Sequence, residues 1–172
     1  VNNIIEGTTG ACIAASSSLN SRFYHNTCVL TALRGSAAIL VSTEGGIDYT
    51  PNKGAEFVNN LIVNDPATPR MIRSTDREYT QPTQPPLTIK SNVYWAGGVA
   101  PTFTWIPAFY QQRGLSEWLA AYLSIYGGVD TSTVADPKLV DYVPTAPVQG
   151  VPDLVKYDIN GKLRTRWTIG AI

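Results

Sequence analysis

Residues 28–41 read CVLTALRGSAAILV, and this stretch indicates a β-rich fold. Two short apolar runs, residues 28–33 and 37–41, flank the sequence RGS at residues 34–36. Apolar runs of this length, bounded by turn residues, are typical of buried strands. We therefore interpret the RGS segment as a bulge or turn that separates two strands.

Strand-like sequence continues on both sides of this stretch. Residues 55–63, 87–95 and 102–110 are further apolar runs, and the sequence DING at residues 158–161 is typical of a hairpin turn. We find no internal repeat. These patterns predict one mainly β domain over residues 1–172, an antiparallel β-sandwich or jelly-roll-like fold.

One helix is predicted over residues 115–126. Apolar residues recur there at helical spacing: Leu115, Trp118, Leu119, Tyr122, Leu123 and Tyr126. Ser116 is the expected N-cap, and Gly127 with Gly128 ends the helix. We expect its broad apolar face to pack on a sheet.

Two proline-rich segments, residues 64–86 and 129–153, are predicted to be long loops. Charged residues make up only 15% of the 172 residues, and the formal net charge is zero. This balance argues against a dedicated nucleic-acid binder, because phosphate binding needs excess positive charge. Low charge is typical of surfaces that contact other subunits, so we expect the two loops to contact partners.

No apolar run is long enough to span a membrane, so we expect none. The only methionine is Met71, so the sequence does not begin at an initiator methionine. We interpret this as release from a precursor, as processing, or as trimming of the chain for study. Cys12 and Cys28 are compatible either with a disulfide or with two buried thiols.

Candidate chemistry is sparse. His25 is the only histidine, and nothing in the sequence lowers the pKa of a cysteine beside it. Neither a zinc-ligand set nor a glycine-rich phosphate loop is present, so we expect no cofactor and no metal. The sequence thus favours a non-enzymatic protein. A hydrolase that uses His25, or a carboxylate pair, remains an alternative.

Two groups of residues are candidates for binding. Arg70, Arg73 and Arg77 form a basic cluster that we interpret as part of an interface loop. The aromatic residues Trp95, Trp105 and Tyr110 are expected in a sheet core, and an exposed ring among them would be able to stack on a sugar.

Two segments resemble capsid proteins of insect picorna-like viruses. Residues 23–37, from Phe23-Tyr24 to Leu33-Arg34-Gly35-Ser36-Ala37, are similar to an aromatic strand that ends in Arg-Gly-Ser in that family. Residues 103–110, FTWIPAFY, are similar to a later strand of the same jelly roll. The resemblance implies an eight-stranded sandwich that assembles into a shell and is released from a polyprotein.

The leading hypothesis is therefore a virion coat or surface-protrusion domain. Its expected partners are other copies of itself, other capsid subunits, and a host receptor or glycan. The alternative is an extracellular or phage-tail module that binds carbohydrate.

Overall fold

The computed structural model describes residues 1–16, 18–31, 37–42, 54–74, 87–105, 112–126, 129–145, 150, 156–164 and 169–170. Within these residues, three sheets made of very short strands form most of the molecule. Nearly all neighbouring strands in the three sheets are parallel.

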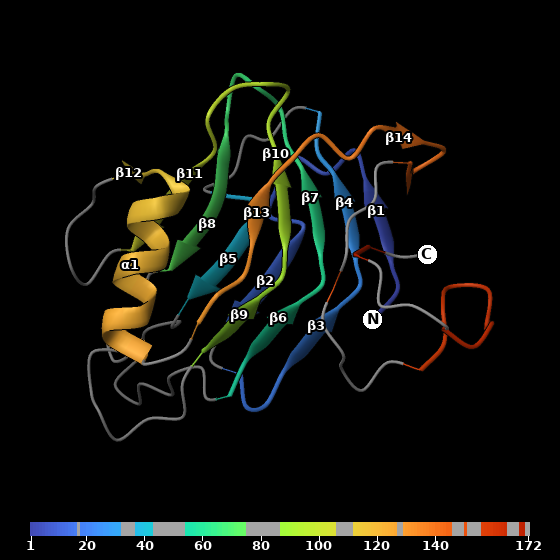
Figure 1. The fold of residues 1–172 in the computed structure, drawn as a ribbon, viewed down its shortest axis with the longest axis horizontal. Helices are drawn as coiled ribbons and strands as arrows, with labels where there is room; N and C mark the ends of the chain where they lie inside the picture. The colour runs from blue at the N-terminus through green and yellow to red at the C-terminus, as the bar shows by residue number, and fades with distance from the viewer. Residues whose placement is uncertain are drawn as a thin grey trace.

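Each sheet collects strands from successive passes of the chain (Figure 1). The first sheet contains, in spatial order, β1 (Ile4–Glu6), β4 (Thr27–Val29), β7 (Leu61–Val63), β10 (Val93–Trp95) and β13 (Thr133–Val134). The second contains β2 (Ile13–Ser16), β5 (Ile39–Ser42), β8 (Arg70–Ser74), β11 (Thr102–Trp105) and β12 (Gln112–Arg113). The third contains β3 (Arg22–Tyr24), β6 (Glu56–Val58) and β9 (Thr88–Lys90).

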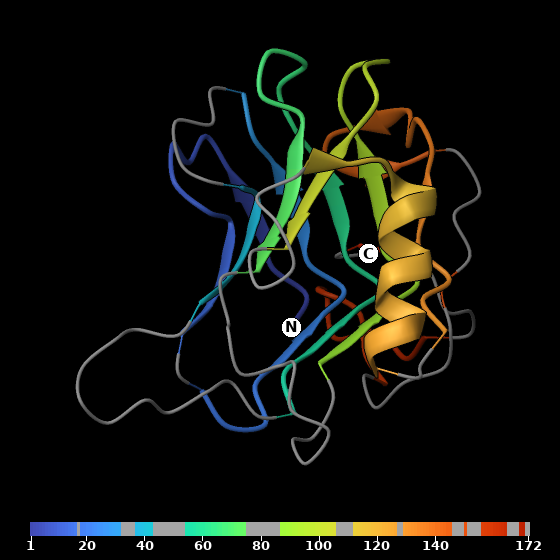
Figure 2. The same cartoon turned by 90° about the vertical axis from the view of Figure 1, so that its left-hand side faces the viewer.

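The order of the strands defines a parallel β-helix. The chain visits the first, second and third sheets in turn and then returns to the first sheet, one strand further along. Each such pass is one coil, and coils stack through backbone hydrogen bonds between equivalent strands. Figure 1 shows the stacked strands side by side, and Figure 2 views the stack from the end where α1 lies.

The prediction of an antiparallel sandwich or jelly roll is wrong. Only β11–β12 and the hairpin of β14 (Leu139–Val140) with β15 (Val143–Pro144) are antiparallel among the described named strands. Several predicted apolar runs do overlap strands of the structure. A short apolar run predicts a strand, but it does not predict whether the neighbouring strand is parallel or antiparallel. The jelly-roll fold that the viral resemblance implied is therefore also absent.

The core lies inside the three sheets and is built from inward columns of side chains. In the first sheet, Cys28, Ile62 and Tyr94 occupy paired positions and are fully buried. In the third sheet, the rings of Phe23 and Phe57 stack with their centroids 4.9 Å apart. Equivalent positions on stacked coils point to the same side, so each coil covers the apolar residues of the one before it.

A disulfide joins Cys12 to Cys28, and thereby links the first coil to the second. The two cysteines are 16 residues apart in sequence. Closing a loop of this length in the unfolded chain stabilises the fold by about 3 kcal/mol in the chain-entropy model. The structure thus decides between the two alternatives that the sequence left open.

The C-terminal part of the chain covers the outer side of the first sheet. Leu61 and Val93 point outward, yet both are fully buried against Ile169. Gly170 donates its N–H to the carbonyl of Asn59 over 2.9 Å. A Cβ at Gly170 would lie 2.7 Å from Oγ1 of Thr27, so only glycine allows this close approach.

The helix α1 (Leu115–Tyr126) is confirmed with the predicted bounds. It begins at Leu115, and Trp118 donates its N–H to the carbonyl of Gly114, so the expected N-cap at Ser116 is wrong. Trp118 stacks on Phe103 with ring centroids 5.7 Å apart. The apolar face of the helix therefore packs on the second sheet, as expected.

The two predicted loops contain regular structure. Strand β8 lies within residues 64–86, and β13, β14 and β15 lie within residues 129–153. The C-terminal hairpin is confirmed by the antiparallel bridge between Tyr157 and Leu163. Its turn places only Gly161 at positive φ, so it is not the type I′ turn that the Asn-Gly pair favours.

Candidate functional site

The outer side of the second sheet carries two arginines side by side. Arg70 pairs with Thr102 and Arg73 pairs with Thr104. Residues three apart on a regular strand point to opposite sides of a sheet. The register shift between Thr102 and Phe103 inserts Met71 as an extra, buried residue, and this bulge brings both arginines to the outer side.

The neighbours of the arginines on this face are small, aliphatic or hydroxylated. Arg73 lies in one row with Ala14, Leu40 and Thr104. A second row contains Ser16 and Ser42, whose hydroxyls are 3.2 Å apart. None of the outward positions described on β2, β5, β8 and β11 is acidic, so the described face is positively charged.

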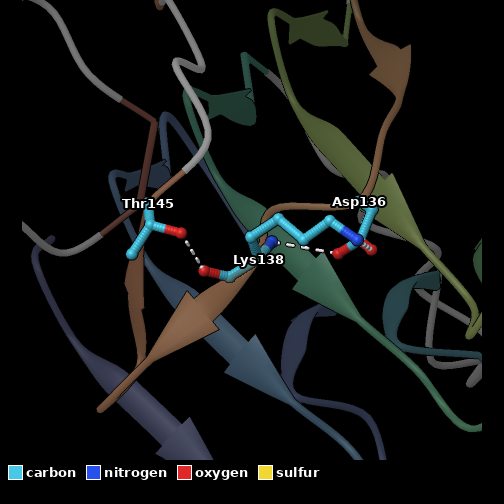
Figure 3. A network of polar contacts seen from close by, with 3 residues as sticks. All are labelled: Asp136, Lys138 and Thr145. Carbon is cyan, nitrogen blue, oxygen red and sulfur yellow. Dashed lines mark hydrogen bonds and ion pairs between the residues drawn. The ribbon is translucent and has the colours of Figure 1, made fainter.

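Ion pairs within the described residues lie on other faces. Arg22 lies 3.7 Å from Glu56 on the third sheet. The ammonium of Lys138 lies 2.5 Å from Asp136 just before β14 (Figure 3). Arg70 and Arg73 are half-buried and have no ion pair among the described residues, so their guanidinium groups are available to an anion.

Just before β14, the carboxylate of Asp136 is paired with Lys138 from the same turn. Lys138 donates its side chain and its backbone N–H to Asp136, and these hydrogen bonds lower the pKa of that carboxyl. Thr145 donates its hydroxyl to the carbonyl of Lys138 over 2.6 Å, which closes the turn (Figure 3). The charge of Asp136 is therefore compensated by Lys138 within the same turn.

Of the other predicted binding residues, the structure describes Trp95 and Trp105, and only Trp105 lies in the same sheet as the arginines. Trp95 ends β10 in the first sheet, where it pairs with Val63 and is half-buried. Trp105 ends β11 and pairs with Ser74 through its backbone. Arg77 and Tyr110 lie outside the described residues. The predicted set therefore divides between two sheets.

His25 lies at a corner of the coil and not in a site. We use corner for the two residues between a third-sheet strand and the next first-sheet strand. His25 takes a left-handed backbone conformation with φ 53° and is fully buried between β3 and β4. A substrate cannot reach a fully buried ring, so this position gives no support to the hydrolase alternative.

The corners hold a ladder of asparagines that the sequence analysis missed. Asn26 accepts a hydrogen bond from Asn3 Nδ2 over 2.9 Å and donates one to Asn60 over 2.9 Å. Asn60 in turn donates to Asn92 over 3.0 Å. Before each asparagine stands a residue at positive φ: Asn2, His25, Asn59 and Ser91.

The ladder is an internal repeat, contrary to our expectation. Its signal in the sequence is a pair of polar residues followed by a strand triplet, as in NNIIE at residues 2–6 and NNLIV at residues 59–63. The steps between successive asparagines are 23, 34 and 32 residues. Since these steps differ, a search for a fixed period does not find the repeat.

The ladder ends at a buried carboxyl beside helix α1. Ser132 donates its hydroxyl to Asp130 over 2.5 Å and accepts the N–H of Asn92 over 2.9 Å. Burial raises the pKa of Asp130 from 3.8 to about 6, although Ser132 and the indole of Trp118 partly oppose this. Burial also raises the pKa of Tyr94, and the charge of Asp130 adds to that effect.

Within the described residues, no three histidine, cysteine or acidic side chains gather as metal ligands would. The described helices include none with the length and apolar character that a membrane crossing requires. Comparisons with protein-family models, with curated proteins and with solved structures give no significant match to this chain.

Proposed function

We propose that this protein is an extracellular recognition module that binds an extended, negatively charged carbohydrate on the outer side of the second sheet. The observation that carries the proposal is the bulge at Met71, which turns Arg70 and Arg73 to the same side. A bulge disrupts the ladder of backbone hydrogen bonds locally, and such irregularities often re-aim side chains at functional sites.

The chemistry of this face suits an anionic sugar polymer. Arginine binds carboxylate and sulfate-like groups through two parallel hydrogen bonds. Leu40 supplies an apolar contact beside Arg73, while Thr102 and Thr104 supply hydroxyls. Because the arginines are half-buried, less water competes with an anion for their guanidinium groups. The electrostatic attraction to a bound anion is therefore stronger than at a fully exposed arginine.

The shape of the sheet also favours an extended ligand. Strands of a β-helix repeat about every 4.8 Å along the axis, so equivalent side chains form straight rows. Solenoids of this kind present long continuous surfaces, and a polymer can contact several coils at once. Ala14, Leu40, Arg73 and Thr104 form one such row over four coils.

The disulfide supports the extracellular part of the proposal. Disulfides such as Cys12–Cys28 persist mainly in oxidising compartments and on exposed particles. This setting is where free polysaccharides and cell-surface glycans are found. The disulfide is also compatible with a module on a phage tail. Locating the native protein, either free outside cells or on a particle, would distinguish the two settings.

Affinity electrophoresis tests the proposal with defined polymers. We expect polygalacturonate, which carries carboxylates, to retard the protein, and neutral dextran to leave its mobility unchanged. Arg73→Ala should weaken the binding about tenfold, which corresponds to about 1.4 kcal/mol. Arg70→Ala should weaken it by a similar factor, and added salt should weaken it further.

Arg22→Ala is the matched control, because Arg22 lies on the third sheet beside Glu56. It should leave the retardation unchanged. Equal losses for Arg22→Ala and Arg73→Ala would contradict a site on the second sheet, as would equal retardation by dextran. Particles seen by light scattering in the absence of polymer would instead favour the coat-protein hypothesis.

A further inference from the structure

Three buried polar atoms lie where helix α1 meets the last rung of the asparagine ladder. They are Oδ2 of Asp130, Nε1 of Trp118 and the hydroxyl oxygen of Tyr94, and none has a hydrogen-bond partner of normal geometry among the described residues. The three residues are only 7%, 3% and 0% exposed. A buried polar group without a partner has given up its hydrogen bonds to water and destabilises the fold. Each of the three atoms therefore needs a partner that is not a described protein group.

The rings of Trp118 and Tyr94 are held in place by one phenylalanine. Trp118 stacks on Phe103 with ring centroids 5.7 Å apart, and Tyr94 meets the same ring edge-on at 5.1 Å. Phe103 is fully buried, and side chains in a close-packed core cannot turn freely. Neither ring can therefore swing away to find another partner for its polar group.

The carboxyl of Asp130 uses one oxygen and leaves the other for these rings. Ser132 donates its N–H and its hydroxyl to Oδ1 over 2.8 Å and 2.5 Å. Burial raises the pKa of Asp130, and the indole of Trp118 partly opposes this rise. Burial also raises the pKa of Tyr94, and the charge of Asp130 adds to the effect. Both rings are thus close to the carboxyl, although neither forms a direct hydrogen bond of normal geometry with it.

Polar groups that are close but not directly bonded are the usual setting for a bridging water. Buried waters in proteins typically make about three hydrogen bonds to groups that otherwise have no partner. Asp130, Trp118 and Tyr94 supply three such groups. Immobilising one water costs less than leaving three buried groups without partners.

The chemistry of the three groups restricts what can bind between them. The indole of Trp118 can only donate, so the bound molecule must accept a hydrogen bond, which a metal cation cannot do. An anion would be repelled by the ionised carboxylate of Asp130 in this buried setting. The molecule must therefore be neutral and able both to donate and to accept. Water is the smallest such molecule and needs the least room in a close-packed core.

We propose that one water molecule binds between Asp130, Trp118 and Tyr94 and joins helix α1 to the end of the asparagine ladder. The water accepts the N–H of Trp118 and donates to Oδ2 of Asp130 and to the hydroxyl of Tyr94. When Asp130 is protonated, the water turns and accepts its O–H instead, so it keeps three hydrogen bonds in both states of the carboxyl.

The water completes a continuous polar path. Asn92 donates its N–H to the hydroxyl of Ser132 over 2.9 Å, and Ser132 donates to Asp130. With the water in place, the path continues to Trp118 on α1. The helix is then fixed to the corners of the β-helix by hydrogen bonds as well as by its apolar contact with Phe103.

Nuclear magnetic resonance of the full chain tests the site directly. The indole proton of Trp118, assigned by its loss in Trp118→Phe, is followed for magnetisation transfer to water. We expect NOE and ROE cross-peaks to water of opposite sign, which show a water that stays bound for longer than the protein takes to rotate. Asp130→Asn should keep these cross-peaks, because its amide donates to the water as the protonated carboxyl does. Asp130→Leu should abolish them.

The stability of Tyr94→Phe gives a second test with a definite sign. If the hydroxyl of Tyr94 binds the water, its removal should raise the equilibrium constant for unfolding about fivefold. If the hydroxyl has no partner, its removal should leave the constant unchanged or lower it, because a buried group without a partner is lost. Tyr157→Phe is the matched control, since Tyr157 is 55% exposed and its hydroxyl is accessible to solvent. It should leave the constant unchanged.

The absence of any cross-peak between the Trp118 indole and water in the folded, unsubstituted protein would overturn the proposal, since the partner would then be a protein group. Cross-peaks of the same sign would also overturn it, because they show proton exchange with solvent and not a bound water. An equilibrium constant for unfolding that Tyr94→Phe does not raise above that of Tyr157→Phe would contradict it as well. Binding of polygalacturonate concerns the outer side of the second sheet, so the two proposals fail separately.

Discussion

The two ends of the β-helix differ in how the backbone polar groups of their edge strands are bonded. At the end near α1, the edge strand β9 has no further strand beside it among the described residues, and a side chain replaces one. The hydroxyl of Tyr122 accepts the N–H of Ile89 over 3.0 Å and donates to the carbonyl of Leu87 over 2.6 Å. At the other end, which is formed by β1, β2 and β3 and is called the open end, Ile4 and Glu6 direct their backbone groups away from β4, and no described residue bonds these groups.

The comparison shows that a solenoid end is closed by hydrogen-bond partners as much as by apolar cover. An unpaired edge can add strands from another chain, and natural proteins protect it. Here α1 provides both apolar contact, through Trp118 on Phe103, and polar partners, through Tyr122. At the end formed by β1, β2 and β3, Ile4 is exposed, and the backbone groups of Ile4 and Glu6 have no hydrogen-bond partner among the described residues.

Substitutions in the asparagine ladder should give the largest difference in the free energy of unfolding between the interior and the open end. Asn60→Ala removes the acceptor of Asn26 and the donors to Phe23 and Asn92, all in a fully buried corner. Each buried group left without a partner costs about 1–3 kcal/mol, so we expect a loss of about 4 kcal/mol in the free energy of unfolding.

Asn3→Ala is the comparison at the open end. Asn3 is exposed, so water replaces its lost hydrogen bonds and the loss should stay below about 1 kcal/mol. Urea unfolding of both variants measures the difference. Equal losses of the free energy of unfolding in the two variants would mean that the open end is as well ordered as the interior and excludes water equally well.

The buried carboxyl of Asp130 should make the stability of the α1 end depend on pH. Its pKa is raised from 3.8 to about 6, so the folded state holds the proton more strongly than the unfolded state. The resulting stabilisation is complete below about pH 4 and is lost as the pH rises through about 6, a change of about 3 kcal/mol.

Asp130→Asn should remove this dependence. The difference in free energy of unfolding between the original protein and the variant should fall from pH 4 to pH 7, as urea unfolding at both values would reveal. Asp136→Asn is the control with the opposite sign, because the pKa of Asp136 is lowered. A difference that rises with pH for Asp130→Asn would show that the carboxyl is ionised in the fold.

Tyr122→Phe should weaken the end of the β-helix near α1 while keeping the apolar contacts that α1 makes there. The variant leaves the N–H of Ile89 and the carbonyl of Leu87 without their partner in a buried position. We expect a loss of about 2 kcal/mol. Hydrogen exchange should show faster exchange of Ile89 and no change in β1. A change confined to β1 would contradict the assignment of Tyr122 to the edge of β9.

The sequence predicts the elements of this fold better than their arrangement. Helix α1 and the apolar runs that overlap β4, β5, β6, β7 and β10 follow from local periodicity, which depends on a few residues only. The direction of pairing depends on which strands meet, and three-residue strands such as Leu61–Val63 do not encode it. The uneven steps between corners hid the repeat that would have indicated a parallel coil.

The candidate site was only partly predictable for a similar reason. The cluster at Arg70 and Arg73 was recognised as a binding candidate, but an alternating strand would place the two on opposite sides. The bulge at Met71 depends on the partner strand β11 and leaves no local signal in the sequence. Burial of His25 likewise follows from its corner, which only the assembled coils define.

The asparagine ladder makes the length of each coil independent of its neighbours. Because every coil is realigned at its corner, the steps of 23, 34 and 32 residues share one register despite their differences. Insertions between the second and third sheets can therefore change one face without shifting the strands above or below. The corners are therefore the part of each coil that must match its neighbours, and the connecting segments are the part whose length can differ.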